Sequence, residues 1–111
     1  MVLELVLIAQ MATITSYRSV PEQTDSSPYY TSIGEHVAPG GCAVSRDLLH
    51  STAPYGTYLY IEGVGVCRVN DTTNTRLSKW VDVWVGTYKE EHKFGVKRKK
   101  VYRIKGIHAA R

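Results

Sequence analysis

The sequence has few of the residues that usually carry metal or covalent chemistry. It contains only two cysteines and four histidines, without the spacing that would assemble the four clustered ligands of a zinc site. A Ser/His/Asp nucleophile motif and a phosphate-binding glycine loop are also missing. The sequence therefore shows no signature of a serine hydrolase, of a P-loop nucleotide-binding protein or of a zinc site, and we predict no cofactor and no metal.

The two cysteines, Cys42 and Cys67, each lie close to valine in a segment that we expect to be a strand. A cysteine in such a place is most often a small buried hydrophobe. The alternative is a disulfide, which the sequence cannot decide because it does not show whether the two Cβ atoms meet. We expect two buried thiols.

Long hydrophobic runs are missing too. The most apolar segment, Met1 to Gln10, is far shorter than the about 20 residues of a membrane-spanning helix. It carries Glu4 and has no basic residue before its apolar run, unlike a secretory signal. We predict a first β-strand there, with a trimmed leader as the alternative, and no membrane span. With no export signal visible, we expect a cell envelope or phage particle, reached by another route, rather than the cytoplasm.

What the sequence does contain fits a small globular fold. Its 111 residues suffice for one domain, which we place over 1–111 with its core at about 13–104. The net charge of +4 favours anionic partners. However, a basic run such as Lys97–Lys100 on an edge strand more often protects against aggregation. Nucleic acid is therefore the weakest of the partners considered.

Short alternating segments separated by Gly and Pro turns predict an all-β fold. After the first segment, we expect strands over Ala12–Arg18, Cys42–Ser45, Thr57–Glu62, Val66–Asn70, Trp80–Val85 and Arg98–Ile104. Helical turns are expected at Ser45–His50 and Thr87–Phe94, and loops at Ser19–Ser32 and Asp71–Lys79. Many short strands with one or two short helices indicate a closed barrel.

Asp82 lies within WVDVWV at 80–85, the strongest strand signal in the chain. Alternation puts its side chain on the face of Trp80 and Trp84, while the valines share the other face. A carboxyl group held between aromatic rings is desolvated, which raises its pKa and suits a general acid. A solvent-facing aspartate on the outer side of a half-buried strand fits the pattern slightly better, so both placements stay open.

Two other aspartates have an ordinary explanation. Asp71 opens a polar loop, where an Asx turn is common. Asp47 stands in the first turn of a short helix, where a carboxylate is favourable. The local pattern alone therefore gives neither of them a functional role.

Seven short segments occur in a characteristic order and spacing: ITSY at 14–17, YTSIG at 30–34, CAVSRD at 42–47, YGTYLYIEG at 55–63, VNDT at 69–72, VDVW at 81–84 and FG at 94–95. With this set the chain resembles the three-aspartate (3D) domain family, over about Thr13 to Ile104. That family includes stationary-phase-survival-type cell-wall proteins and the catalytic barrel of membrane-bound lytic transglycosylase A. The resemblance implies a six-stranded double-psi β-barrel. It also implies cleavage of peptidoglycan between N-acetylmuramic acid and N-acetylglucosamine, leaving a 1,6-anhydro end.

The resemblance also implies roles for individual residues. The family is named for three aspartates, and the matching positions here are Asp47, Asp71 and Asp82. By this likeness Asp82 is the acid/base catalyst, and the other two tune or position it. The likeness further implies that sugar hydroxyls bind along a groove lined by Tyr17, Thr31, Ser32 and Thr72. The implied partner is the glycan strand of peptidoglycan.

The sequence departs from the family after the second aspartate. Many catalytic members have two glycines there, which let the substrate approach the backbone, whereas this chain has Thr72 and Thr73. Two functions stay open. We favour a lytic-transglycosylase-like enzyme; the alternative is a non-catalytic barrel that serves as a structural or binding module, for instance beside other proteins of a phage particle.

Overall fold

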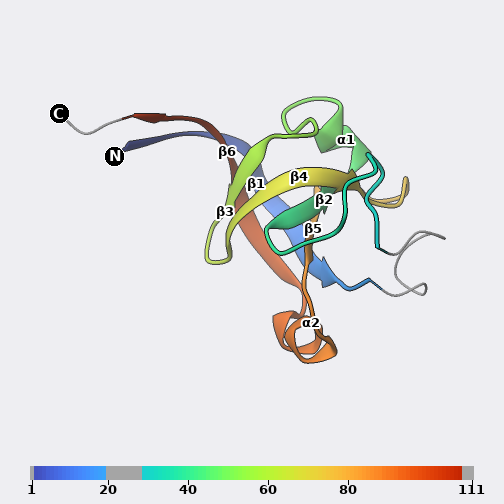
Figure 1. Cartoon of the computed structure of the whole chain (residues 1–111). Helices are drawn as coiled ribbons and strands as arrows, with labels where there is room; N and C mark the ends of the chain where they lie inside the picture. The colour runs from blue at the N-terminus through green and yellow to red at the C-terminus, as the bar shows by residue number, and fades with distance from the viewer. Residues whose placement is uncertain (1, 20–28, 109–111) are drawn as a thin grey trace.

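The computed structural model describes residues 2–19 and 29–108, which form a closed β-barrel with two short helices (Figure 1). The strands are β1 (Val2–Tyr17), β2 (Gly41–Val44), β3 (Tyr58–Ile61), β4 (Gly65–Thr72), β5 (Trp80–Trp84) and β6 (Lys97–His108). The helices are α1 (Arg46–Leu49) and α2 (Tyr88–Phe94). The predicted all-β, six-stranded barrel with short helices is confirmed.

The strands follow one another around the barrel in the order β1-β5-β2-β4-β3-β6. The pairs β1–β5 and β2–β4 are parallel, and the other neighbours are antiparallel. Parallel neighbours require a crossover connection rather than a tight turn. Residues 67 positions apart, Thr15 and Asp82, therefore become direct neighbours.

The barrel interior is filled by side chains that alternate inward along the strands. Each large aliphatic side chain that is fully buried contributes about 1.5–3 kcal/mol of hydrophobic stabilisation. The most completely buried aliphatic side chains are Ile14, Val44, Leu59, Ile61, Val69, Val81 and Val101. They come from all six strands, so closing the barrel and burying the core are the same event.

Cys42 and Cys67 form a disulfide, which corrects the expectation of two buried thiols. The bond joins β2 to β4 across 5.8 Å between the Cα atoms, and both residues lie in the core. The sequence could not show this, because the two strands become neighbours only through parallel pairing. In the chain-entropy account, a cross-link between residues 25 positions apart stabilises the fold by about 3–4 kcal/mol.

Both helices form where the sequence predicted them. In α2 the Thr87 hydroxyl accepts the backbone N–H of Glu90 at 3.1 Å, as expected for a capping box. Gly95 ends the helix with φ at 67°, a backbone conformation that favours glycine. In α1, Ser45 occupies the N-cap position with extended backbone angles, and the single turn buries Leu48 and Leu49.

Three strand boundaries differ from the prediction by more than one residue. The two N-terminal segments form the single strand β1, and β6 continues past Ile104 because the two strands pair along most of their length. Asp71 and Thr72 were expected in a loop, but they extend β4 because they pair with β2. The predicted loop at Ser19–Ser32 falls largely outside the described residues.

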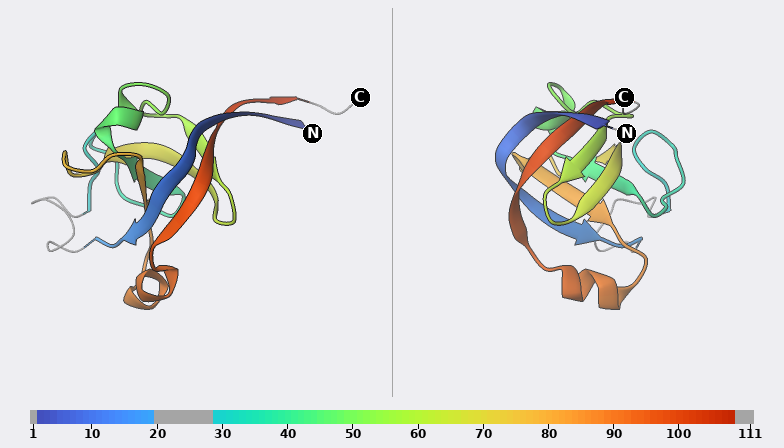
Figure 2. Two further views of the ribbon diagram at one scale, coloured as in Figure 1. Left: turned by 180° about the vertical axis from the view of Figure 1, so that it is seen from behind. Right: turned by 90° about the vertical axis from the view of Figure 1, so that its left-hand side faces the viewer.

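Beyond the barrel, β1 and β6 continue together as a two-stranded ribbon (Figure 2). We define the ribbon as residues 2–7 of β1 and 102–108 of β6, which pair from Val2–His108 to Leu7–Tyr102. At the base of the ribbon, Tyr102 and Arg103 also pair with β3. Its outer part, 2–6 and 104–108, has no third strand beside it in the described sheet (Figure 1). The projection makes the molecule elongated, with extents of 47 × 29 × 25 Å.

Candidate functional site

The outer face of the parallel β1–β5 pair gathers polar and aromatic side chains. The register places Thr15 beside Asp82 and Tyr17 beside Trp84. Val81 is fully buried on the inner face, so Asp82 points to the outer face, as the alternation predicted. The acid therefore lies on the barrel wall and not in the barrel core.

Asp82 is a half-buried acid with a direct hydroxyl donor. Thr15 Oγ1 donates to Asp82 Oδ1 at 2.9 Å, and the indole Nε1 of Trp80 donates in turn to Thr15 Oγ1 at 2.8 Å. Burial raises the pKa of Asp82 to about 6, although the Thr15 hydrogen bond lowers it, and the charges of Glu91 and Asp71 add to the rise. This corrects the slight preference for a solvent-facing aspartate. Near pH 6 about half of the molecules carry a proton that Asp82 can donate.

Tyr17, two residues after Thr15 on β1, forms a hydrogen bond with the second aspartate. Its hydroxyl donates to Asp71 Oδ2 at 3.4 Å. Burial raises the pKa of Tyr17 far above its usual value, and the carboxylates of Asp71 and Asp82 raise it further, so the phenol stays a hydrogen-bond donor. Asp71 Oδ1 also accepts the backbone N–H groups of Ser32 at 3.1 Å and Thr72 at 2.8 Å. Asp71 is thereby fixed in one orientation.

Asp47 is not joined to this cluster. Its carboxylate accepts the backbone N–H of Lys79, with distances of 3.0 and 3.3 Å to its two oxygens. Burial opposes ionisation, but hydrogen bonds from Ser45 and from the Lys79 backbone outweigh it and lower the pKa of Asp47. Within the described residues no hydrogen bond links Asp47 to Asp71 or Asp82. Its position ties α1 to the segment that precedes β5.

Three further residues were expected to line a sugar groove, and their hydroxyls are placed differently. Thr31 is buried, and its hydroxyl accepts a backbone N–H of its own loop. Ser32 is exposed and shares a 2.8 Å hydrogen bond with the hydroxyl of Tyr55. Thr72 donates to the Val44 carbonyl at 2.9 Å. Of the three, Ser32 offers an accessible hydroxyl beside Asp71.

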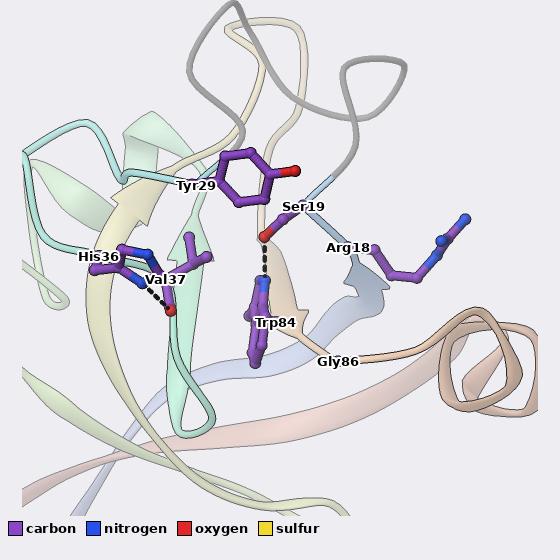
Figure 3. Close-up of a pocket in the computed structure, with 7 residues that line it drawn as sticks. All are labelled: Arg18, Ser19, Tyr29, His36, Val37, Trp84 and Gly86. Atoms are coloured by element: carbon purple, nitrogen blue, oxygen red, sulfur yellow. Dashed lines mark hydrogen bonds between the residues drawn. The ribbon is translucent and has the colours of Figure 1, made fainter.

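A pocket of about 310 Å³ opens next to the Asp82 cluster. Figure 3 shows Trp84 within it, with Nε1 donating to Ser19 Oγ at 2.9 Å. Because Trp84 and Asp82 share one face of β5, the pocket and the acid belong to one surface. A pocket of this size, with an aromatic ring and a few polar groups, suits an amphipathic ligand. Its lining residues are Arg18, Ser19, Tyr29, His36, Val37, Trp84 and Gly86.

Helix α2 borders one end of this surface. Arg18 Nε lies 3.0 Å from Glu91 Oε1, and the Arg18 guanidinium lies 5.2 Å from the centre of the Tyr88 ring. The ion pair anchors the helix to the end of β1, and it brings Glu91 close enough to raise the pKa of Asp82. The helix therefore contributes to the electrostatics of the acid without touching it through a hydrogen bond.

Sequence reasoning missed Thr15 as a partner of the acid, and it gave His36 no role. Thr15 lies in a segment that alternates correctly, but only the parallel register places it beside Asp82. His36 reaches the pocket from the loop before β2, and no periodic pattern marks a loop residue. The alternation in β1 could predict that the Thr15 side chain points outward, but it could not predict that Asp82 lies beside it.

Residues 2–19 and 29–108 contain neither a metal-binding cluster nor a membrane-spanning helix. No group of three His, Cys, Asp or Glu side chains there could hold a metal ion. Neither of the two helices in these ranges is long and apolar enough to cross a membrane. The site described above consists of carboxyl, hydroxyl and aromatic groups.

The fold is similar to solved structures of an expansin from Clavibacter michiganensis. Its apo structure superposes with a TM-score of 0.59 at 15% identity, covering 90% of this chain and 52% of the expansin. A mutant of the expansin in complex with cellohexaose gives a TM-score of 0.51 at 15% identity, covering 91% and 52%. This chain therefore spans about half the length of the expansin that it resembles.

No protein-family model matches the sequence, and no curated protein sequence matches it. At 15% identity the structural likeness shows the fold alone. The closed six-stranded barrel with its two parallel pairs, and its expansin neighbours, fit the predicted double-psi β-barrel. Membership of the 3D family stays a prediction.

Proposed function

We propose that this barrel binds the glycan strands of a cell wall and cleaves peptidoglycan with Asp82 as the acid/base catalyst. The observation that carries the proposal is the half-buried Asp82 carboxyl, with its pKa at about 6, on a surface that also holds Trp80 and Trp84. Protonation of a glycosidic oxygen requires a carboxylic acid whose pKa is raised, so that a large fraction of the molecules still carry the proton near pH 6. Acids perturbed in this way concentrate at functional sites.

The chemistry needs one carboxyl group and no water nucleophile. Asp82 donates its proton to the glycosidic oxygen, and the bond from that oxygen to the anomeric carbon of N-acetylmuramic acid breaks. The 6-hydroxyl oxygen then bonds to the anomeric carbon, and its proton passes to the Asp82 carboxylate. The products are a 1,6-anhydro end and a free 4-hydroxyl, and the acid is restored. The second carboxylate of an ordinary glycosidase is not required.

The neighbours of Asp82 act as positioning residues in this proposal. Thr15 donates to the carboxyl group and holds its rotamer. Asp71 accepts three hydrogen bonds, including that of Tyr17, so its charge stays close to Asp82 and supports the raised pKa. Asp47, which the family resemblance placed with them, would act through the position of α1.

A polysaccharide ligand is supported by the structural neighbours. One of the expansin structures contains cellohexaose, a linear oligosaccharide. The present chain has the same barrel architecture and an open aromatic pocket on its outer wall. The choice of peptidoglycan among linear glycans rests on the resemblance to the 3D family.

The proposal places the protein at a cell envelope or in a phage particle. The buried Cys42–Cys67 disulfide supports this location, because structural disulfides persist in oxidising surroundings and are rare in a reducing cytosol. Glycan strands of the cell wall are accessible from such surroundings.

A non-catalytic glycan-binding or structural barrel is the second candidate. The observation that favours it lies beside Asp71, where the likeness to catalytic relatives calls for two glycines and this chain has Thr72 and Thr73. The Thr72 side chain fills that place and bonds to the Val44 carbonyl. A barrel of this kind would hold the glycan, or another protein of a phage particle, without cutting it.

Digestion of purified peptidoglycan tests the proposal, with the soluble products analysed by mass spectrometry. The wild type is expected to release 1,6-anhydro products, and Asp82→Asn is expected to lower their yield by about 100-fold or more, because the proton donor is lost. The yield with wild type should fall as the pH rises well above 6, where Asp82 loses its proton.

The matched control is Glu62→Gln, which removes an exposed carboxylate from the loop after β3. It should cleave as the wild type does. If a folded wild type releases no anhydro products from any wall type, the enzyme proposal is wrong. Retained binding to insoluble peptidoglycan in that case would establish the second candidate.

A further inference from the structure

The ribbon carries an apolar face that lies in solvent. Leu3, Leu5 and Leu7 alternate along β1, so their side chains share one face of the sheet. They are 46%, 39% and 44% exposed, although leucine is among the residues most often buried. Three alternating leucines on one exposed face form a contiguous apolar patch, unlike the single apolar residues that are scattered over most protein surfaces.

The apolar face continues from the ribbon across the barrel wall. Leu5 pairs with Ile104 and Leu7 with Tyr102 across the two strands, and paired residues share a face. The Tyr102 ring stacks on Tyr60 of β3, with 6.1 Å between ring centres, and Tyr60 pairs with Val66 of β4. We call this surface the apolar stripe; it comprises Leu3, Leu5, Leu7, Ile104, Tyr102, Tyr60 and Val66.

The charged side chains of the ribbon lie on its other face. Glu4 alternates with the leucines along β1, and its Oε1 lies 3.9 Å from Lys105 Nζ. Arg103 pairs with Leu59, whose side chain points into the core, and it donates to the Thr52 carbonyl. The stripe itself therefore holds no charge that would attract anionic lipid or nucleic acid, although the whole chain carries +4.

We infer that the apolar stripe is a dimer interface, against which the same stripe of a second copy packs face to face. The side chains of the stripe leave on the order of 500 Å² in water, at the upper end of what a monomer usually exposes in one patch. Two copies would bury about 1,000 Å² in total, the size at which specific interfaces begin. An uncharged face fits an identical face, because homodimer interfaces are the more apolar class and a two-fold axis matches each patch with itself.

Sedimentation velocity over a dilution series tests this inference. The wild type is expected to sediment with twice its chain mass of 12.4 kDa and to dissociate on dilution. Leu5→Lys should raise the dissociation constant by about tenfold or more, because it places a charge in the apolar contact. Leu3→Lys, nearer the tip of the ribbon and farther from the barrel core, should have the same effect. The matched control is Val96→Lys, which puts the same charge at a 72% exposed position outside the stripe and should leave the dimer intact.

Near-ultraviolet circular dichroism checks that each variant keeps the folded barrel. Wild type that stays monomeric at every concentration overturns the inference, whatever the variants do. A dimer that both lysine variants leave unchanged overturns it too, because the contact would then lie elsewhere. Cosedimentation of a monomeric wild type with anionic phospholipid vesicles would also contradict it and would assign the stripe to a lipid surface.

Discussion

The two halves of strand β1 place their side chains in opposite ways. In the ribbon half, Leu3 to Leu7 leaves apolar side chains in water. In the barrel half, Thr15 donates a hydrogen bond to the half-buried acid Asp82, and Tyr17 donates one to Asp71. Both halves depart from the rule that apolar groups are buried and charges are exposed, and each departure costs free energy in the isolated monomer.

The comparison shows that one strand serves two surfaces. The pairing with β5 ends at Thr13, so the barrel half is enclosed by neighbours and the ribbon half keeps only β6. Burial in the barrel half raises the pKa of Asp82. In the ribbon half the leucine side chains stay exposed and are available to contact a partner. The first departure indicates a site for chemistry, and the second indicates a site for assembly.

The largest expected contrast is between two leucines, one in each region. Leu59 is fully buried in the barrel, and Leu5 is 39% exposed in the ribbon. Leu59→Ala should lower the free energy of unfolding by about 2–5 kcal/mol, because it leaves a cavity. Leu5→Ala should cost less than about 1 kcal/mol in the dilute monomer, where its neighbour is water. Urea denaturation at low protein concentration measures both, and equal losses would remove the distinction between the two regions.

A smaller effect is expected from the charge of Asp82. Its folded-state pKa of about 6 lies above the ordinary value of about 3.9, so the folded protein holds the proton more tightly than the unfolded chain. The contribution of Asp82 to the free energy of unfolding is then fully present below about pH 4, and it is lost as the pH rises through 6. The Asp82→Asn variant has no carboxyl group to ionise and so does not lose this contribution. The difference in free energy of unfolding between variant and wild type should therefore move by about 2–3 kcal/mol in favour of the variant as the pH rises from 4 to above 6.

Thermal or urea unfolding across this pH range gives the difference between the two proteins. A matched Glu62→Gln variant should show a much flatter difference, because that carboxylate is exposed. A flat difference for Asp82→Asn as well would show that the acid is solvated, and the contrast between the two halves of β1 would then fail.

Much of the fold followed from local patterns. The alternation in WVDVWV predicted which face Asp82 shares with Trp80 and Trp84, and the Thr87–Glu90 spacing predicted the start of α2. Both features depend on residues only a few positions apart, so a local sequence pattern is enough to predict them.

The rest depended on which strands meet. The parallel register that joins Thr15 to Asp82, and the β2–β4 pairing that lets Cys42 reach Cys67, link residues many positions apart. The exposed ribbon was also unpredictable, because an apolar β-strand looks the same whether the core or a partner covers it. Long-range pairing is a property of the whole barrel and leaves little trace in a local window.

The most direct test of the central claim is to map where a glycan binds, using amide and indole chemical shifts of isotope-labelled protein. Soluble peptidoglycan strands are the probe, with cellohexaose as a second linear glycan. We expect shifts at Thr15, at Ser32 and at the indole N–H groups of Trp80 and Trp84, while Leu3 to Leu7 stay unchanged. Shifts confined to the ribbon, or no shifts with either glycan, would contradict the assignment of the Asp82 surface as the glycan site.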